Sequence, residues 1–194
     1  MGKWRSRAAR LVAALLAVST CPTAAPAETI TPQSIEFSVE AKHESTASSC
    51  VIMMTALNYP VSPEALNFRA GVWQGIDQNS RSVSLTGFTL DVGNLKFQNG
   101  LIVGTQKTPL AATAFASRSF NSFGRLYDVD MEDGGHGAHT ADPHVAIDFL
   151  TAVWAGDFEV AFAAKNIPLE RTYHISSAPS ADVIRQFKDC LGTL

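Results

Sequence analysis

Three histidines lie within eleven residues, in the stretch GGHGAHTADPH that runs from residue 134 to residue 144. Imidazole nitrogen is a common ligand of zinc, which takes four ligands, or three and a water molecule when the ion is catalytic. Nearby aspartates can add carboxylate oxygens. One hypothesis is therefore a site for zinc or another divalent metal, with the candidate ligands His136, His139, His144, Asp130 and Asp142.

The spacing of these residues favours a simpler interpretation. It contains neither the H-E-x-x-H pattern of helical zinc sites nor paired cysteines. Glycines at 134, 135 and 137 make the backbone flexible, so ordering the stretch around a metal costs conformational entropy. We expect a solvated acidic loop that contains histidines, and no bound cofactor.

Cysteine chemistry offers a second hypothesis. The stretch SSCVIMMTALNYPVSPEAL resembles the beginning of papain-like peptidases of the bacteriocin-processing and phytochelatin-synthase type. The resemblance implies that Cys50 opens a hydrophobic helix and acts as the nucleophile, with His144 as the base and Asn166 as a group that orients it. The sequence departs from that pattern at Val51, where these families have glycine, and at Glu44, where they have an oxyanion-stabilising glutamine.

The first 27 residues have the organisation of a secretory signal peptide. Four basic residues precede the apolar run LVAALLAV, which is too short to span a bilayer as a helix. Ala25-Pro26-Ala27 then matches an A-x-A cleavage site, so we expect a mature chain that begins at Glu28. Lipidation at Cys21 is the alternative, and the residues before it fit that signal less well. The sequence thus predicts export to a bacterial periplasm or secretion.

Only two cysteines, Cys50 and Cys190, follow the predicted signal peptide. In an oxidising compartment, two cysteines in one domain most often form a disulfide. Such a bond joins an early part of the fold to its last helix, and chain-entropy reasoning puts its stabilisation at about 4 to 5 kcal/mol. A reactive thiolate needs positive charge nearby, and only Lys42 and His43 supply it around Cys50.

The charge of the mature chain limits its partners. All 18 acidic residues follow residue 27, against 11 of the 15 basic ones, which leaves a net charge of −7 with histidine neutral and no basic cluster. Nucleic acids and anionic membrane surfaces are poor partners, because both are bound through accumulated Lys and Arg. No later apolar run is long enough to span a membrane. The remaining partner is an unidentified protein or small-molecule ligand.

The apolar pattern predicts antiparallel β-sheet over most of the chain. IEFSVEA alternates as a half-buried strand does, and the apolar run after Cys50 either pairs with it or forms a buried helix. The apolar residues then change phase at Gly87 and at Gly93, where a β-bulge or bend is expected. Asn99-Gly100 predicts a tight hairpin turn. Further strand-like segments cover residues 110–129, 158–162 and 171–176.

Two helices are expected near the C-terminus. Asp142 is a natural N-cap for a helix over residues 143–155, with Pro143 at its first position. A second helix follows Ser180 and places Cys190 on its apolar stripe. These elements predict a single secreted α+β domain over residues 28–194, with a sandwich-like, mainly antiparallel sheet and two helices near the C-terminus.

Trp73 is the candidate for ligand recognition. It lies with Arg69 and Asp77 around the stretch GVWQGIDQN, which we interpret as a Gly-rich polar loop where an aromatic side chain can anchor a partner. A place in the core is the alternative. The chain has no G-x-S-x-G motif, P-loop or dinucleotide fingerprint. The sequence therefore favours a binding or accessory protein without catalytic activity.

Overall fold

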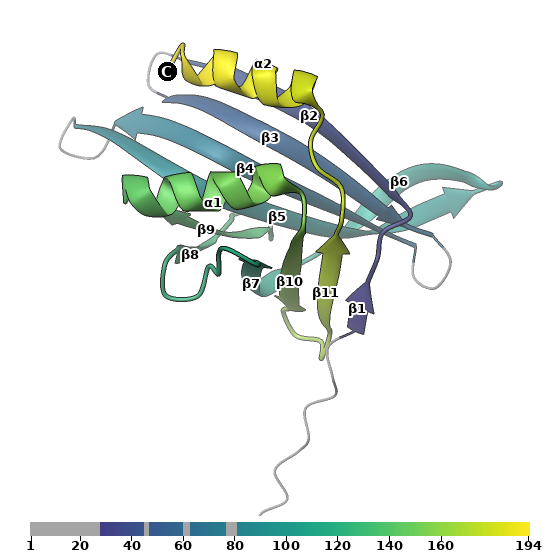
Figure 1. Ribbon diagram of the computed structural model, residues 1–194. Coiled ribbons are helices and arrows are strands. Elements are labelled where there is room, and N and C mark those ends of the chain that lie inside the picture. Colours follow the sequence, from purple (N-terminus) through teal and green to yellow (C-terminus); the bar gives the residue numbers. More distant parts are fainter. Residues whose placement is uncertain (1–27, 45–46, 60–62, 77–80) are drawn as a thin grey trace, which may run out of the picture.

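The computed structural model describes residues 28–44, 47–59, 63–76 and 81–194. The predicted signal peptide and Asp77 lie outside these residues. Two β-sheets and two helices enclose a common apolar core (Figure 1). The protein is thus an α+β fold made mostly of antiparallel sheet, as the sequence predicts.

The large sheet is antiparallel throughout. Its strands follow the order β2 (Ser34–His43), β3 (Ala47–Asn58), β4 (Glu64–Ile76), β5 (Ser82–Gln98), β9 (His136–Thr140) and β8 (Tyr127–Asp130), with β6 (Leu101–Thr108) paired to the end of β5. The small sheet has the order β1 (Glu28–Ile30), β11 (Glu170–Ile175), β10 (Phe158–Ala164) and β7 (Leu110–Ser117). β1 runs parallel to β11, so the first and last described strands are neighbours.

Both helices have the predicted caps. Helix α1 (Pro143–Ala155) begins where the Asp142 carboxylate accepts hydrogen bonds from two backbone amides, and ends at Gly156 with a φ of 71°. Helix α2 (Ala181–Leu191) begins at Ser180, whose hydroxyl accepts from the Val183 amide. α1 lies beside β4 and β5, and α2 lies along β2 and β3 (Figure 1). Neither helix, nor any other in the described residues, is long and apolar enough to cross a membrane.

The face of the large sheet that meets the helices and the small sheet, here called the inner face, carries a cluster of aromatic rings. Phe68 and Phe88 project from it, with their ring centroids 5.5 Å apart. Phe115 and Phe158 of the small sheet and Phe149 of α1 complete the cluster. Each of these five side chains is at most 1% exposed, so the inner face is closed by the core.

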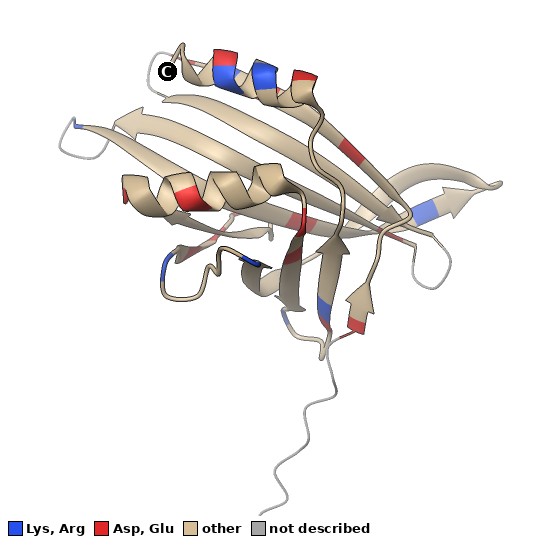
Figure 2. Cartoon of the chain, viewed as in Figure 1, with Lys and Arg blue, Asp and Glu red and all other residues tan. Residues whose placement is uncertain are grey.

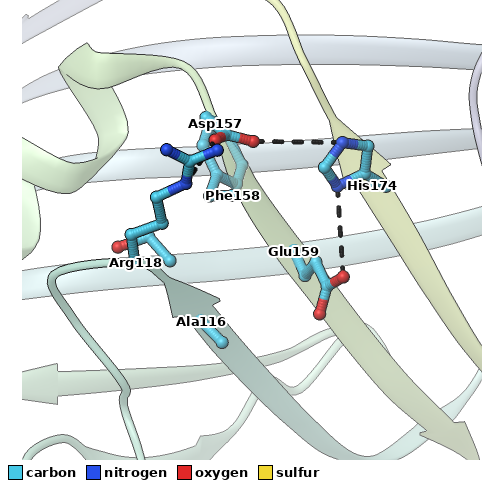
Figure 3. Close-up of a pocket in the computed structure, with 7 residues that line it drawn as sticks. Ala116, Arg118, Asp157, Phe158, Glu159 and His174 are labelled. Atoms are coloured by element: carbon cyan, nitrogen blue, oxygen red, sulfur yellow. Dashed lines mark ion pairs between the residues drawn. The ribbon is translucent and has the colours of Figure 1, made fainter.

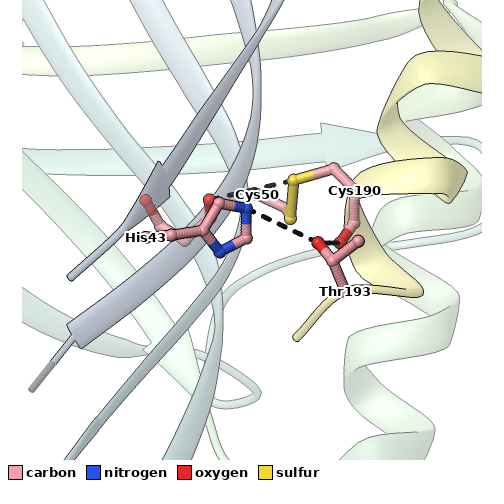
Figure 4. Close-up of a disulfide and its surroundings, with 5 residues drawn as sticks. His43, Cys50, Cys190 and Thr193 are labelled. Atoms are coloured by element: carbon pink, nitrogen blue, oxygen red, sulfur yellow. Dashed lines mark hydrogen bonds between the residues drawn. A yellow bond between two sulfur atoms is a disulfide. The ribbon is translucent and has the colours of Figure 1, made fainter. Parts of the chain in front are cut away.

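The predicted disulfide is present. Cys50 of β3 and Cys190 of α2 are bonded, with Cα atoms 5.8 Å apart (Figure 4). The Thr193 hydroxyl donates to the Cys190 carbonyl oxygen at 2.6 Å and lies 3.5 Å from Nε2 of His43. The bond therefore holds the last helix against the inner face of the large sheet.

Several strand predictions are confirmed. Residues 34–43 pair with residues 48–57, so the apolar run after Cys50 is a strand and not a helix. The hairpin turn lies at Asn99-Gly100, where both residues have positive φ, 53° and 78°. The segment predicted over residues 110–129 is shorter, because only β7 and β8 at its two ends are strands.

The expected bulges at Gly87 and Gly93 are absent. β4 and β5 pair in unbroken register from Glu64 opposite Asn94 to Ile76 opposite Ser82. The change of phase is instead a change of face: Phe88 points into the core, whereas Leu85 points to the opposite side, here called the outer face. Two loop predictions were wrong. Residues 71–76, predicted to lie in a Gly-rich polar loop, belong to strand β4. Residues 136–140 of the histidine stretch, predicted to be a solvated loop, form strand β9, where His136 is only 4% exposed.

Candidate functional site

Trp73 lies near the end of β4 on the outer face of the large sheet. Side chains alternate along this strand, so Phe68 and Val72 face the core while Arg69 and Trp73 face outward. The register places Trp73 opposite Ser49 of β3 and Leu85 of β5. The helices and the small sheet pack on the other face, so the indole side chain stays partly exposed.

Two adjoining depressions meet at Trp73. One, of about 360 Å³, extends toward β2 and β3, and the other, of about 170 Å³, extends toward β8 and β9. Trp73, Thr89 and Met131 line both of them. We call the two depressions together the Trp73 groove, which also includes Glu40, Val51, Arg69, Gln74, Leu85, Val129 and His139.

Beside Trp73, two glycines leave the outer face of the sheet without side chains. Gly71 of β4 and Gly87 of β5 stand opposite each other on the outer face. A Cβ atom on Gly71 would lie 2.1 Å from the Cys50 carbonyl oxygen, and one on Gly87 would lie 2.0 Å from that of Ala138. Neither position accepts a side chain without moving the neighbouring strand. The outer face therefore has a stretch of bare backbone next to an aromatic ring.

Charged and apolar groups meet along this groove. Nη2 of Arg69 lies 3.8 Å from Oε2 of Glu40, and both side chains are nearly half exposed. A solvated pair of this kind contributes only about 0 to 1 kcal/mol, so both groups remain available to a ligand. Val51 is apolar and only 3% exposed, although it belongs to the outer face. The groove thus combines an apolar centre with a polar margin.

The histidine stretch contributes one side chain, that of His139, to the groove. Successive side chains of β9 point to opposite faces, so His136 faces the core and His139 faces the groove. Nδ1 of His136 lies 2.9 Å from the Thr113 hydroxyl, which satisfies this buried ring. The two histidines therefore cannot share a metal ion.

The other predicted metal ligands have separate structural roles. His144 is exposed in the first turn of α1, and Asp142 caps that helix. Asp130 forms an ion pair with Lys165 at 3.0 Å. Within the part of the chain that the structure describes, no three His, Cys, Asp or Glu side chains are placed to hold a metal ion.

The thiol-enzyme hypothesis is not supported by the structure. Cys50 is oxidised, 0% exposed and part of a strand, so it offers no thiolate and opens no helix. His144 lies in α1, and Asn166 lies in an exposed turn after β10 with a φ of 64°. The papain-like arrangement therefore lacks its nucleophile.

A second polar cluster lies on the outer side of the small sheet (Figure 3). His174 of β11 stands opposite Glu159 of β10, with its Nδ1 4.0 Å from a glutamate oxygen and its Nε2 3.9 Å from Asp157. Nε of Arg118 lies 3.4 Å from the same aspartate. An open depression of about 360 Å³ adjoins these side chains.

This His174 cluster has no nucleophile aimed at the histidine. Ser117 lines the same depression, but its hydroxyl accepts hydrogen bonds from the amides of Ser119 and Phe120 in a tight turn. The arrangement fits a solvated network of charges on a sheet surface better than a catalytic centre. No sequence motif marks this cluster, although both Glu159 and His174 occupy polar positions of predicted strands.

Comparison of the chain with protein-family models, curated proteins and solved structures found no match. The Trp73 groove is therefore interpreted from its own geometry.

Proposed function

We propose that this protein is an exported, disulfide-stabilised binding protein without catalytic activity, and that the Trp73 groove holds its ligand. One observation carries the proposal: a partly exposed tryptophan on a central strand, beside glycines that leave the backbone bare. Aromatic side chains of this kind supply large contact area at low entropic cost and dominate many binding sites.

The lining of the groove indicates the chemistry of the ligand. Leu85, Val129 and Met131 extend the apolar surface of the indole toward β8 and β9. Arg69 and Gln74 provide hydrogen-bond donors on the other side. Such a surface fits an elongated ligand with one apolar face and hydrogen-bonding groups along its edge, as in a short peptide or a saccharide.

The disulfide supports export as part of the proposal. Disulfides persist in oxidising compartments and are rare in the cytosol. Cys50 and Cys190 are bonded across nearly the whole described chain. The predicted signal peptide is consistent with the same location.

The test uses Trp73 itself as the reporter. The mature chain has two tryptophans, Trp73 and Trp154, so Trp154→Phe leaves the groove residue as the single fluorophore. Ligand-observed NMR against mono- and disaccharides and dipeptides identifies binders, which are then titrated while the emission of Trp73 is followed. The variants are compared by ligand-observed NMR, because Trp73→Ala removes the fluorescent reporter. We expect Trp73→Ala to weaken binding at least tenfold and Phe123→Ala, an exposed aromatic outside the groove, to leave it unchanged. Ligands that bind the Trp73→Ala variant as tightly as the unsubstituted protein would contradict the proposal.

A further inference from the structure

The hairpin formed by β5 and β6 extends beyond the rest of the large sheet (Figure 1). β4 pairs with β5 only as far as Asn94, and among the described residues β6 pairs with no strand except β5. We call residues 95–105 the hairpin tip. The side chains of residues 96–105 are exposed on both faces of this segment, whereas Leu95 is only 8% exposed.

The hairpin tip is apolar. Phe97, Leu101, Ile102 and Val103 are 47%, 71%, 46% and 58% exposed, although such side chains normally lie in a core. These four residues lie close together on the paired strands of one hairpin, where Phe97 stands opposite Ile102. A contiguous apolar patch on a soluble domain marks an interaction surface.

The edge strand of the hairpin tip lacks two of the usual protections of a sheet edge, charge and proline. Natural edge strands carry charges or proline, which discourage pairing with other chains. The sequence from Leu101 to Gln106, LIVGTQ, contains neither. By contrast, the edge strand β2 carries Glu36, Glu40 and Lys42 (Figure 2).

Charge indicates which partner this surface fits. The mature chain has a net charge of −7, so two copies repel one another over most of their surface. From residue 93 to residue 106 there is no acidic residue and one lysine, Lys96. Two copies can therefore approach one another at the hairpin tip with the least repulsion. The single lysine supplies too little positive charge to hold the tip on an anionic membrane.

We propose that the hairpin tip is the self-association surface of this protein, and that two copies dimerise by packing their Phe97, Ile102 and Val103 side chains together. The pairing of β5 with β6 shifts by one residue between Lys96 and Phe97. The contact therefore rests on side chains and not on a continuous strand ladder between copies. Closed two-fold dimers use the same patch on both subunits, and one apolar patch per chain suits that symmetry.

The dimer is weak. A specific interface usually buries about 1,200 to 2,000 Å² in total, and a few side chains at a hairpin tip reach only the low end of this range. We therefore expect a dissociation constant in the micromolar range and a dimer whose population depends on protein concentration. Trp73 lies at the other end of the strands, so ligand binding and dimerisation use separate surfaces.

Sedimentation equilibrium of the mature protein, from low to several hundred micromolar, tests the proposal. Ile102→Lys should raise the dissociation constant at least tenfold. Ile147→Lys makes the same change at an exposed isoleucine on α1 and should leave it unchanged. Circular dichroism melting verifies that both variants are folded.

A second measurement does not depend on weakening the hairpin tip. Both cysteines of the mature protein are in the disulfide, so Leu101→Cys introduces a single free thiol. Mild oxidation should give a covalent dimer, and Ile147→Cys should not. A wild-type protein that stays monomeric at every concentration, or that instead sediments with phosphatidylglycerol vesicles, would overturn the proposal. So would equal effects of the two lysine substitutions.

Discussion

The two faces of the large sheet use the same strands for different purposes. On the inner face, Phe68 and Phe88 are closed over by the small sheet and α1. On the outer face, Trp73 and Leu85 from the same two strands remain partly exposed. The rings of the inner face are fully buried and stabilise the fold, whereas Trp73 and Leu85 keep part of their apolar surface in contact with solvent. The difference identifies the outer face as the place to look for binding.

Strand β5 shows how one segment serves both faces. Its central residues Phe88, Leu90 and Val92 face the core. Leu85 before them and Phe97 after them face outward, in the Trp73 groove and the hairpin tip respectively. Both proposed surfaces therefore use apolar residues at positions of one strand that alternate away from the core.

Removing an inner ring should have the largest effect. Phe88 is 1% exposed and lies 5.5 Å from Phe68 and 6.0 Å from Phe149 between ring centroids. Phe88→Ala leaves a cavity among these rings and should lower the free energy of unfolding by about 3 to 5 kcal/mol. Urea unfolding followed by circular dichroism measures the change. A loss below about 1 kcal/mol would show that the inner face is not the stabilising one.

The disulfide should contribute the next largest effect. Cys50→Ala combined with Cys190→Ala releases α2 from the inner face and should cost about 2 to 4 kcal/mol, because measured values usually fall below the chain-entropy figure for so long a loop. Reduction of the wild-type protein should cost a similar amount. Intact mass after alkylation provides the control: two alkyl groups should add only after reduction. A group added without reduction would show a free thiol and contradict the structure.

A buried hydrogen bond at the margin of the inner face should have a smaller, pH-dependent effect. The Tyr173 hydroxyl donates to Oε2 of Glu64, which also pairs with Nη1 of Arg171 at 3.0 Å. Burial, together with the hydrogen bond to Glu64, raises the pKa of Tyr173 above its ordinary value. The folded protein therefore keeps a proton that the unfolded chain loses from about pH 10.

The protonated Tyr173 hydroxyl therefore makes its full contribution to the free energy of unfolding below about pH 10. This contribution decreases as the pH rises further. Tyr173→Phe should cost about 1 to 3 kcal/mol at neutral pH, because Glu64 loses a donor, and should flatten the alkaline fall in stability. Denaturant unfolding at neutral and alkaline pH measures both effects. Tyr127→Phe, at an exposed tyrosine, should change neither.

An outer-face substitution should have the smallest effect on stability. Leu85→Ser removes a partly exposed side chain and should change the free energy of unfolding by less than about 1 kcal/mol. The same substitution should weaken the binding of ligands that change the fluorescence of Trp73, because Leu85 adjoins that ring in the groove. A large loss of stability with unchanged binding would reverse the roles assigned to the two faces.

Local signals were enough to predict most elements of the fold. The caps at Asp142 and Ser180 and the Asn99-Gly100 turn are properties of a few adjacent residues, and each lies where it was predicted. The disulfide was predicted because only two cysteines follow the predicted signal peptide. Export, and the identity of a ligand, stay predictions.

The candidate site was less accessible to sequence reasoning. The Trp73 groove depends on the register that brings Ser49 and Leu85 beside Trp73, and no local pattern specifies a register. His136 was expected in a solvated loop because glycines flank it. Its partner Thr113 lies 23 residues away and left no local signal. The change of phase at Gly87 was the available signal, and it indicated a change of face where we expected a bulge.

The pairing of β1 with β11 has a consequence for the order of events during folding. Glu28 stands beside Arg171 in the small sheet, and Cys50 is bonded to Cys190. Contacts between such distant segments form slowly, because a long loop must close before they are made. A chain that is still emerging from a ribosome or a translocation channel lacks β11 and α2 and cannot complete its core. The core therefore cannot close until β11 and α2 have emerged.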